Sequence, residues 1–160
     1  TDIPEVGRFA VIGDPTGAFC SIFRSGDDGE VETPEVAMAS GNFCWNELLT
    51  TDQNKAFDFY ADLVGWARQD MDMGPMGNYV MLMRGEMGIG GMMNIPPGAP
   101  QPPAWLPYVA VGDVDASAAL LVELGGTLCV GPQDIPGMGR FAVASDPLGA
   151  MFAIFMSVGA

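Results

Sequence analysis

The sequence predicts an α+β fold in which two βαβββ modules join into a curved mixed sheet. The inner face of such a sheet forms a cup, and the helices lie outside it. Two observations predict this fold. The same order of strand and helix patterns occurs twice between residues 41 and 160, and local sequence recurs between the two halves. In that second, weaker repeat Met76–Tyr79 matches Met138–Phe141, and Asp52 matches Asp113.

Module one covers residues 41–97. Its first strand is expected at Phe43–Thr50, and Asp52 provides an N-cap for a helix over Gln53–Val64, where apolar residues recur at helical spacing. Gly65 is a typical helix end. Three strands follow, separated by turns that contain Gly and Pro: Ala67–Met73, Asn78–Arg84 and Gly90–Ile95.

Module two covers residues 103–160 and follows a proline-rich linker, Ile95–Pro103. Each proline lacks the N–H that a sheet interior needs, so the linker cannot continue the sheet. After it the same order recurs, with Asp113 as the N-cap. The expected elements are a strand at Trp105–Val111, a helix at Val114–Leu124, and strands near Thr127–Val130, Arg140–Ala144 and Met151–Met156.

A stronger repeat links the two ends of the chain. Residues 2–26 match residues 134–158 with 15 of 25 positions identical. The second copy closes module two, whereas the first has no module before it. We therefore expect residues 1–24 to be the terminal β-hairpin of a preceding, mostly missing domain of the same type. Residues 25–40 would be a connector with a short strand at Val36–Met38.

A hairpin alone exposes unpaired backbone groups and an apolar face, which includes Phe9, Val11, Phe19 and Ile22. We expect it to dock. Three partners are open: a second copy in a homodimer, an N-terminal fragment, or an edge of its own domain.

Composition excludes several classes of function. The 160 residues carry 20 acidic and six basic side chains, a net charge of −14 that repels nucleic acid. A cationic ligand would be attracted, although an acidic surface also serves solubility. No apolar run is long enough to cross a membrane, so we expect no membrane partner and a cytoplasmic location.

Histidine is absent, so no Ser-His-Asp or Cys-His relay can form. The three cysteines, Cys20, Cys44 and Cys129, have no CxxC spacing and are expected in the core.

Two motifs carry a family resemblance. One is V-x-D-V-D-A before a helix, at Val111–Ala116, and the other is G-R-F-A-V-x-x-D-P-x-G-A-x-F, at Gly139–Phe152. With the order of elements, they resemble the vicinal oxygen chelate superfamily of glyoxalase I, bleomycin resistance proteins and extradiol dioxygenases over Gly41–Ser157. Asp14-Pro15-Thr16-Gly17 repeats the D-P-x-G turn, so the chain resembles the C-terminal part of a tandem two-domain glyoxalase-like protein.

The resemblance also implies where metal ligands would stand. These positions hold Trp45, Leu106, Ala153 and either Gly91 or Met92, and Ser21 in the first hairpin. None offers imidazole or carboxylate. We therefore expect no metal or cofactor, and metal-dependent chemistry in this domain is disfavoured.

Alternation along the strands predicts which side chains line the cup, because residues two apart share a face. The predicted lining is Phe43, Trp45, Glu47, Leu49, Leu106, Tyr108, Ala110, Met151, Ala153 and Phe155. Glu47 is the candidate catalytic residue. It could instead pair with a cationic ligand, or hydrogen-bond to Tyr108 or backbone for structural reasons.

Two other features have open interpretations. Arg140 is expected to form surface ion pairs. The methionines of Met71–Met93 could fill the core, which we favour, or form an adaptable binding surface.

Three functions remain open. The first is metal-free binding of a small molecule, cationic or aromatic, in an apolar cup. The second is a lyase or isomerase of glyoxalase type, either with its active site in the missing domain or using Glu47. The third is a structural or interaction domain whose cup is plugged by its own side chains.

Overall fold

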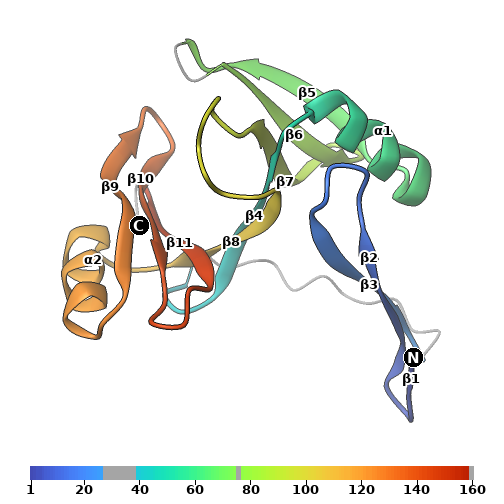
Figure 1. The fold of residues 1–160 in the computed structure, drawn as a ribbon, viewed down its shortest axis with the longest axis horizontal. Coiled ribbons are helices and arrows are strands. Elements are labelled where there is room, and N and C mark those ends of the chain that lie inside the picture. Colours follow the sequence, from blue (N-terminus) through green and yellow to red (C-terminus); the bar gives the residue numbers. More distant parts are fainter. Residues whose placement is uncertain (27–38, 75–76, 159–160) are drawn as a thin grey trace. The chain divides into compact units, whose positions relative to one another are not determined.

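The computed structural model describes residues 1–26, 39–74 and 77–158 (Figure 1). The strand expected at Val36–Met38 lies outside these ranges. In chain order the elements are β1 (Asp2–Ile3), β2 (Gly7–Gly13), β3 (Phe19–Ser25), β4 (Phe43–Thr50), α1 (Gln53–Val64), β5 (Ala67–Asp72), β6 (Asn78–Arg84), β7 (Met87–Asn94), β8 (Ala104–Ala110), α2 (Val114–Glu123), β9 (Thr127–Ile135), β10 (Gly139–Ser145) and β11 (Met151–Ser157).

Two sheets contain these strands. The larger is open and mixed, with the order β5-β6-β7-β4-β8-β11-β10-β9, and the smaller has the order β1-β2-β3. In the larger sheet β4 pairs with β7 and β8 with β11 in parallel, and the outer strands pair antiparallel. The predicted α+β class and both strand–helix repeats are confirmed. Neither α1 nor α2 is long and apolar enough to cross a membrane.

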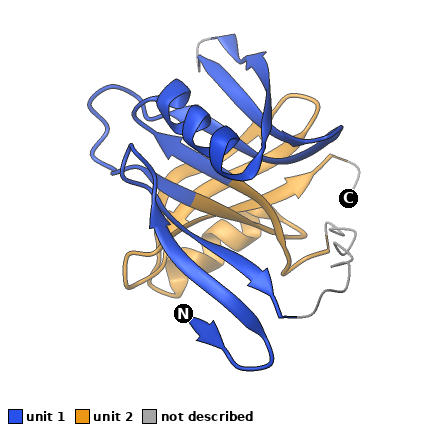
Figure 2. Cartoon of the chain, turned by 90° about the vertical axis from the view of Figure 1, so that its right-hand side faces the viewer, with its two compact units in different colours: residues 1–32, 47–105 blue, residues 33–46, 106–160 orange. Residues whose placement is uncertain are grey.

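The chain divides into two compact units (Figure 2). Unit 1 contains residues 1–32 and 47–105, and unit 2 contains residues 33–46 and 106–160. Both β4 and β8 contribute residues to each unit.

In unit 1, α1 covers one face of its strands. Ala56 and Tyr60 of the helix are buried against a core that includes Leu48, Val80 and Met92. Asp52 caps the helix, because its carboxylate accepts hydrogen bonds from the N–H groups of residues 54 and 55. The last turn ends at Gly65, whose φ of 73° suits a glycine.

In unit 2, α2 covers one face of β10 and β11. Val114 and Ala118 of the helix are buried against Ala142 and Ile154. Arg140 binds Asp115 in the first turn of α2 and also Asp134, so the expected surface ion pairs of Arg140 are confirmed. The hydrogen bonds from Arg140 hold the pKa of Asp115 below its usual value.

Two strands extend well beyond one of their predicted ends. β7 begins at Met87 and not at Gly90, and β9 continues to Ile135 and not only to Val130. The pairing of β7 with β6 and the pairing of β9 with β10 each contain a register shift, which accommodates the additional residues. Pro132 is tolerated in β9 because β9 is an edge strand.

The N-terminal hairpin forms the small sheet and contacts the rest of unit 1 through its turn. Ala18 is fully buried in the same core as Tyr60, and the Thr50 hydroxyl donates a 2.9 Å hydrogen bond to that of Thr16. Of the partners left open above, this contact is with the hairpin's own chain. It is made by side chains at the turn, and no strand is added to the larger sheet.

A buried polar network fastens this contact. The Tyr60 hydroxyl donates to Asp14 Oδ2 at 3.2 Å and accepts a hydrogen bond from Trp105 Nε1 at 3.0 Å. Asp14 Oδ1 accepts from the backbone N–H groups of its own turn. Burial is the main reason that the pKa of Tyr60 is raised far above its usual value, and the nearby Cys20 and Asp14 raise it further.

Removal of the Tyr60 hydroxyl should destabilise unit 1. Tyr60→Phe removes the acceptor of the Trp105 N–H and the donor to Asp14 Oδ2, while Oδ1 keeps the hydrogen bonds of its turn. We therefore expect the free energy of unfolding to fall by about 1–3 kcal/mol. Urea denaturation measures this change. Asp62→Asn, on the exposed side of α1, is the control and should have little effect. Equal stability of Tyr60→Phe and wild type would contradict the network.

Alkaline pH should weaken the protein through the same residue. The folded chain keeps a Tyr60 proton that the unfolded chain loses near pH 10, so stability should fall as pH rises above about 10. Between pH 9 and 11 we expect the Tm of wild type to fall by on the order of a few degrees more than the Tm of Tyr60→Phe. Parallel pH profiles for the two proteins would show that the Tyr60 phenol is not the cause.

Candidate functional site

Unit 2 presents an apolar face on the side of its strands that points away from α2. Tyr108 pairs with Ala153, and Ala110 pairs with Phe155. Because Ile154, between Ala153 and Phe155, contacts α2, these paired residues share the opposite face. Leu106 and Met151 lie two residues along the same strands and share it as well.

The first half of β4 also belongs to unit 2 and runs beside β8. The Gly41 N–H donates to the Ala110 carbonyl at 2.8 Å, and the Cys44 thiol donates to the Tyr108 carbonyl at 3.6 Å. Phe43 and Trp45 come from this segment. All the predicted cup residues except Glu47 and Leu49 therefore belong to unit 2.

Accessibility differs sharply among these residues. Leu106, Tyr108, Ala110 and Ala153 are buried. Phe43 is 67% exposed and Met151 is 40% exposed, while Trp45 and Phe155 are half-buried. A molecule from solvent would therefore meet the aromatic and methionine side chains first.

Glu47, the one carboxylate among the residues predicted to line the cup, belongs to unit 1. Glu47 pairs with Gly91 of β7, and Leu49 pairs with Met93. The intervening residues Leu48 and Met92 contact α1, so Glu47 and Leu49 face away from that helix. Glu47 is only 7% exposed.

Tyr79 is a residue of this face that the sequence analysis missed. Its hydroxyl oxygen lies 1.7 Å from the position that a Cβ on Gly91 would occupy. The phenol of β6 therefore extends across the glycine that pairs with Glu47. Glu47 and Tyr79 share one face of unit 1, on either side of a residue without a side chain. The sequence signal that could have identified Tyr79 is the alternation of side chains along β6 together with the glycines of β7.

The methionines of this region divide between the two interpretations. Met92 is fully buried in the core under α1, as the core interpretation predicts. Met71, Met81 and Met93 are half-buried and share the face of Tyr79, as their pairing shows. These three lie where the alternative interpretation, an adaptable binding surface, would need them, and that role stays a prediction.

The profile of the Glyoxalase/Bleomycin resistance protein/Dioxygenase superfamily matches residues 43–154. The chain belongs to this superfamily. The match begins at the first residue of β4, covers α1 and α2, and ends within β11, the last strand of the larger sheet.

Curated relatives agree with this assignment. The chain is 40% identical over 154 residues to "Putative glyoxylase CFP32" of Mycobacterium tuberculosis, and 34% identical over 153 residues to "Anthracycline biosynthesis protein DnrV" of Streptomyces peucetius. Each alignment covers 96% of this chain but only 57% and 54% of the relative. The chain thus spans little more than half the length of these superfamily members.

Solved structures share the superfamily fold at low sequence identity. The 2,3-dioxygenase LapB from Pseudomonas sp. KL28 matches 97% of this chain and 59% of its own, with a TM-score of 0.61 and 15% identity. The Mn(II)-bound glyoxalase from Novosphingobium aromaticivorans matches 96% of this chain and 50% of its own, with a TM-score of 0.59 and 16% identity.

Metal-binding members of the superfamily raise the question whether this chain fits a metal ion. Of the two looser candidates in module one, Gly91 shares the face of Glu47, whereas Met92 lies in the core. The Tyr79 phenol fills the space above Gly91. Trp45, Leu106 and Ala153 offer no acceptor to a cation. The residues at these positions do not fit a divalent ion, and residues 1–26, 39–74 and 77–158 contain no cluster of three His, Cys, Asp or Glu residues that could hold one.

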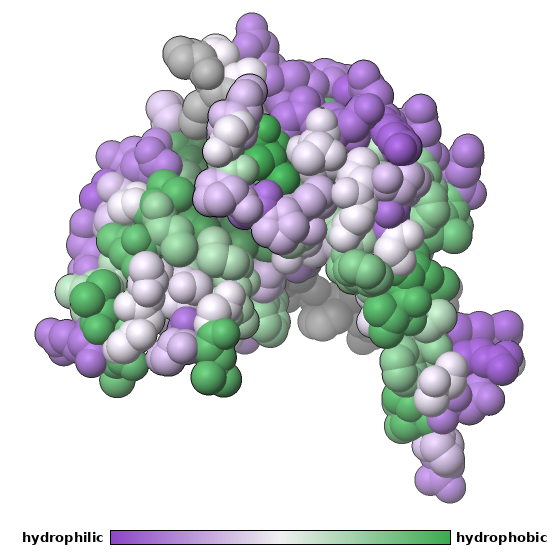
Figure 3. All heavy atoms as spheres, in the orientation of Figure 1, coloured by the Kyte–Doolittle hydropathy of each residue, from purple (hydrophilic) through white to green (hydrophobic). Residues whose placement is uncertain are grey.

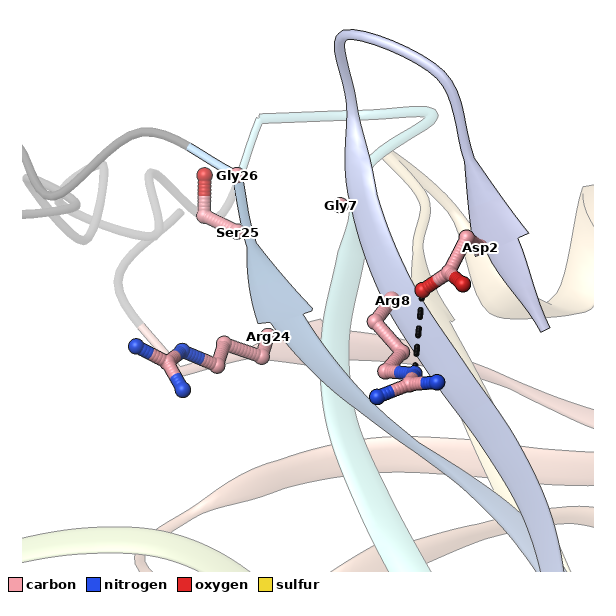
Figure 4. Close-up of a pocket in the computed structure, with 6 residues that line it drawn as sticks. All are labelled: Asp2, Gly7, Arg8, Arg24, Ser25 and Gly26. Atoms are coloured by element: carbon pink, nitrogen blue, oxygen red, sulfur yellow. Dashed lines mark ion pairs between the residues drawn. The ribbon is translucent and has the colours of Figure 1, made fainter.

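An open pocket of about 300 Å³ lies on the N-terminal hairpin (Figure 4). Its lining includes Arg8 and Arg24, which pair across β2 and β3, and Asp2, which forms a 2.9 Å ion pair with Arg8. None of the predicted cup residues contributes to it.

The contact between Tyr79 and Gly91 should not tolerate a methyl group. In Gly91→Ala the new Cβ would overlap the Tyr79 oxygen, so we expect a loss of about 1–3 kcal/mol in the free energy of unfolding, measured in urea. Gly131→Ala in β9 is a matched control, since no atom lies within 4 Å of its added Cβ. If Gly91→Ala is as stable as the control, Tyr79 does not occupy this space.

Proposed function

We propose that this superfamily member binds a small organic molecule without a metal ion, on the face of β4 that carries Phe43, Trp45 and Glu47. The observation that carries the proposal is the chemistry of the residues predicted to line the cup. They are apolar or aromatic apart from Glu47, which is almost fully buried.

The aromatic residues of the predicted cup that solvent can reach indicate the ligand's chemistry. Phe43, Trp45 and Phe155 offer ring surfaces for an aromatic ligand. Glu47 and the net charge of −14 favour a positive charge on it. We therefore propose a planar aromatic ligand that carries a cationic group.

A second candidate function is supported by Glu47 and Tyr79 together. A shielded carboxylate can take a proton from carbon, and a phenol on the same face can donate a hydrogen bond to a developing oxyanion. This pair would suit a lyase or isomerase of glyoxalase type, which accords with the relative named "Putative glyoxylase CFP32".

Replacement of Glu47 separates these functions. The probes are cationic planar aromatic amines, each with its uncharged parent compound, proflavine and acridine among them. Wild type should gain Tm with the cationic compounds. In Glu47→Gln we expect affinity for them to fall by about 10- to 100-fold, and affinity for the uncharged parents to change little. Thermal shift and titration calorimetry measure both.

Glu86→Gln is the matched control, because Glu86 is an exposed carboxylate in the turn between β6 and β7. The same three proteins should be assayed for turnover of hemithioacetals. Turnover by wild type and Glu86→Gln but not by Glu47→Gln would support the second candidate. No binding and no turnover by wild type would contradict both and leave the structural role.

A further inference from the structure

Two arginines stand opposite each other on the N-terminal hairpin. Arg8 of β2 and Arg24 of β3 are register partners, and like charges placed directly opposite each other destabilise an antiparallel strand pair. The chain has only six basic residues against 20 acidic ones. Setting two of these six against each other is favourable only where an anion lies beside them.

The second copy of the hairpin has a different balance of charge. There the equivalent register partners are Arg140 and Met156. Arg140 forms ion pairs with both Asp115 and Asp134. In the second copy, therefore, one guanidinium group is bound by two carboxylates.

In the first copy two guanidinium groups share a single carboxylate. Asp2 meets Arg8 at Nε, 2.9 Å away, and the two side chains of this ion pair are 72% and 73% exposed. An ion pair so open to water contributes little free energy. Within residues 1–26, 39–74 and 77–158, Arg24 forms no ion pair with a carboxylate, and its side chain extends away from Asp2 in Figure 4.

Both arginines line the open pocket of about 300 Å³ on this hairpin, which we call the arginine pocket. A volume of this size accommodates a small organic molecule. Gly7, also in the lining, lets β2 and β3 approach closely beside the arginines, because a Cβ there would clash with the Arg24 carbonyl oxygen. Hydrophilic side chains lie next to hydrophobic ones over the hairpin, at the lower right in Figure 3.

We infer that the arginine pocket binds a small molecule through an oxyanion group, a carboxylate or a phosphate, which accepts hydrogen bonds from both Arg8 and Arg24. A guanidinium group is planar, and its paired N–H donors match the geometry of these oxyanions. The side chain of Arg24 is exposed and can rotate toward such a group.

Two further points define this site. The net charge of −14 repels anions at long range, so binding depends on the direct hydrogen bonds from the two arginines. None of the residues that line the pocket belongs to the predicted cup. The inference therefore does not depend on the proposed function.

Titration of the 160-residue chain with inorganic phosphate and with succinate, at constant ionic strength, tests the inference. NMR follows the backbone amides of Gly7, Ser25 and Gly26 and the Nε–H group of Arg24. We expect these signals to shift saturably with at least one of the two anions. Saturation with phosphate would identify a phosphate group as the ligand's anion, and saturation with succinate alone would identify a carboxylate.

Arg24→Met is the decisive variant, because it gives the first copy the Arg–Met pair that the second copy already has. We expect its affinity for the anion to fall by about 10-fold or more. Its Tm without the anion should not fall, since the substitution removes the like charge opposite Arg8. Arg84→Met, at an exposed arginine of β6 in the same unit, is the matched control and should bind as wild type does.

Two results of these titrations would overturn the inference. One is the absence of a saturable shift with either anion. The other is an equal loss of affinity in Arg24→Met and Arg84→Met, which would show a general effect of net charge.

A further variant examines carboxylates of the chain itself. Asp27 and Asp28 follow Gly26 in the sequence. The double substitution Asp27→Asn and Asp28→Asn should bind the anion no less tightly than wild type, because it removes negative charge. Anion binding by this variant but not by wild type would identify these carboxylates as the partners of the two arginines and overturn the inference.

Discussion

Because α1 and α2 each cover only one face of their strands, successive residues along β4, β7 and β11 have opposite surroundings. Leu48 and Met92 are enclosed under α1, and Ile154 is enclosed under α2. Glu47, Gly91 and Ala153 alternate with them and belong to the other faces. This one-sided packing decides which side chains can meet a ligand, and a shift of one residue in any strand register would exchange the two sets.

On those other faces, aromatic rings repeatedly lie over glycines of the neighbouring strand. Tyr79 covers Gly91, Phe155 covers Gly139 and Phe23 covers Gly7, each so closely that a Cβ would clash with the ring. A ring over a glycine fills space that an ordinary residue would occupy. At Gly91, one of the two positions that the resemblance gives for a metal ligand in module one, the ring is a phenol, and its hydroxyl fills the space above the glycine.

The D-P-x-G turn occurs twice, and a few substitutions give its two copies different contacts. In both copies the aspartate Oδ1 accepts hydrogen bonds from backbone N–H groups of its turn. In the first copy Oδ2 also accepts from Tyr60, and Thr16 bonds to Thr50. The second copy has Leu148 in place of Thr16, and that side chain is 95% exposed. The first turn thereby fastens the hairpin to α1, while its strands keep an uncovered face.

Sequence alone determined the order of elements, the helix caps at Asp52 and Asp113, and the resemblance to the superfamily. It also determined that the positions where this resemblance would put metal ligands carry no imidazole or carboxylate. These follow from local periodicity, capping chemistry and residue identity, which need no knowledge of neighbours. Only the tertiary structure decided that Tyr79 lies over Gly91, that Met92 and Met93 have opposite surroundings, and that Asp14 binds Tyr60. Such contacts join residues far apart in the chain, and they depend on strand register and on the direction of each side chain. The first residue of β7 and the last residue of β9 depend on bulges in the pairing with the neighbouring strands, so they too required the tertiary structure.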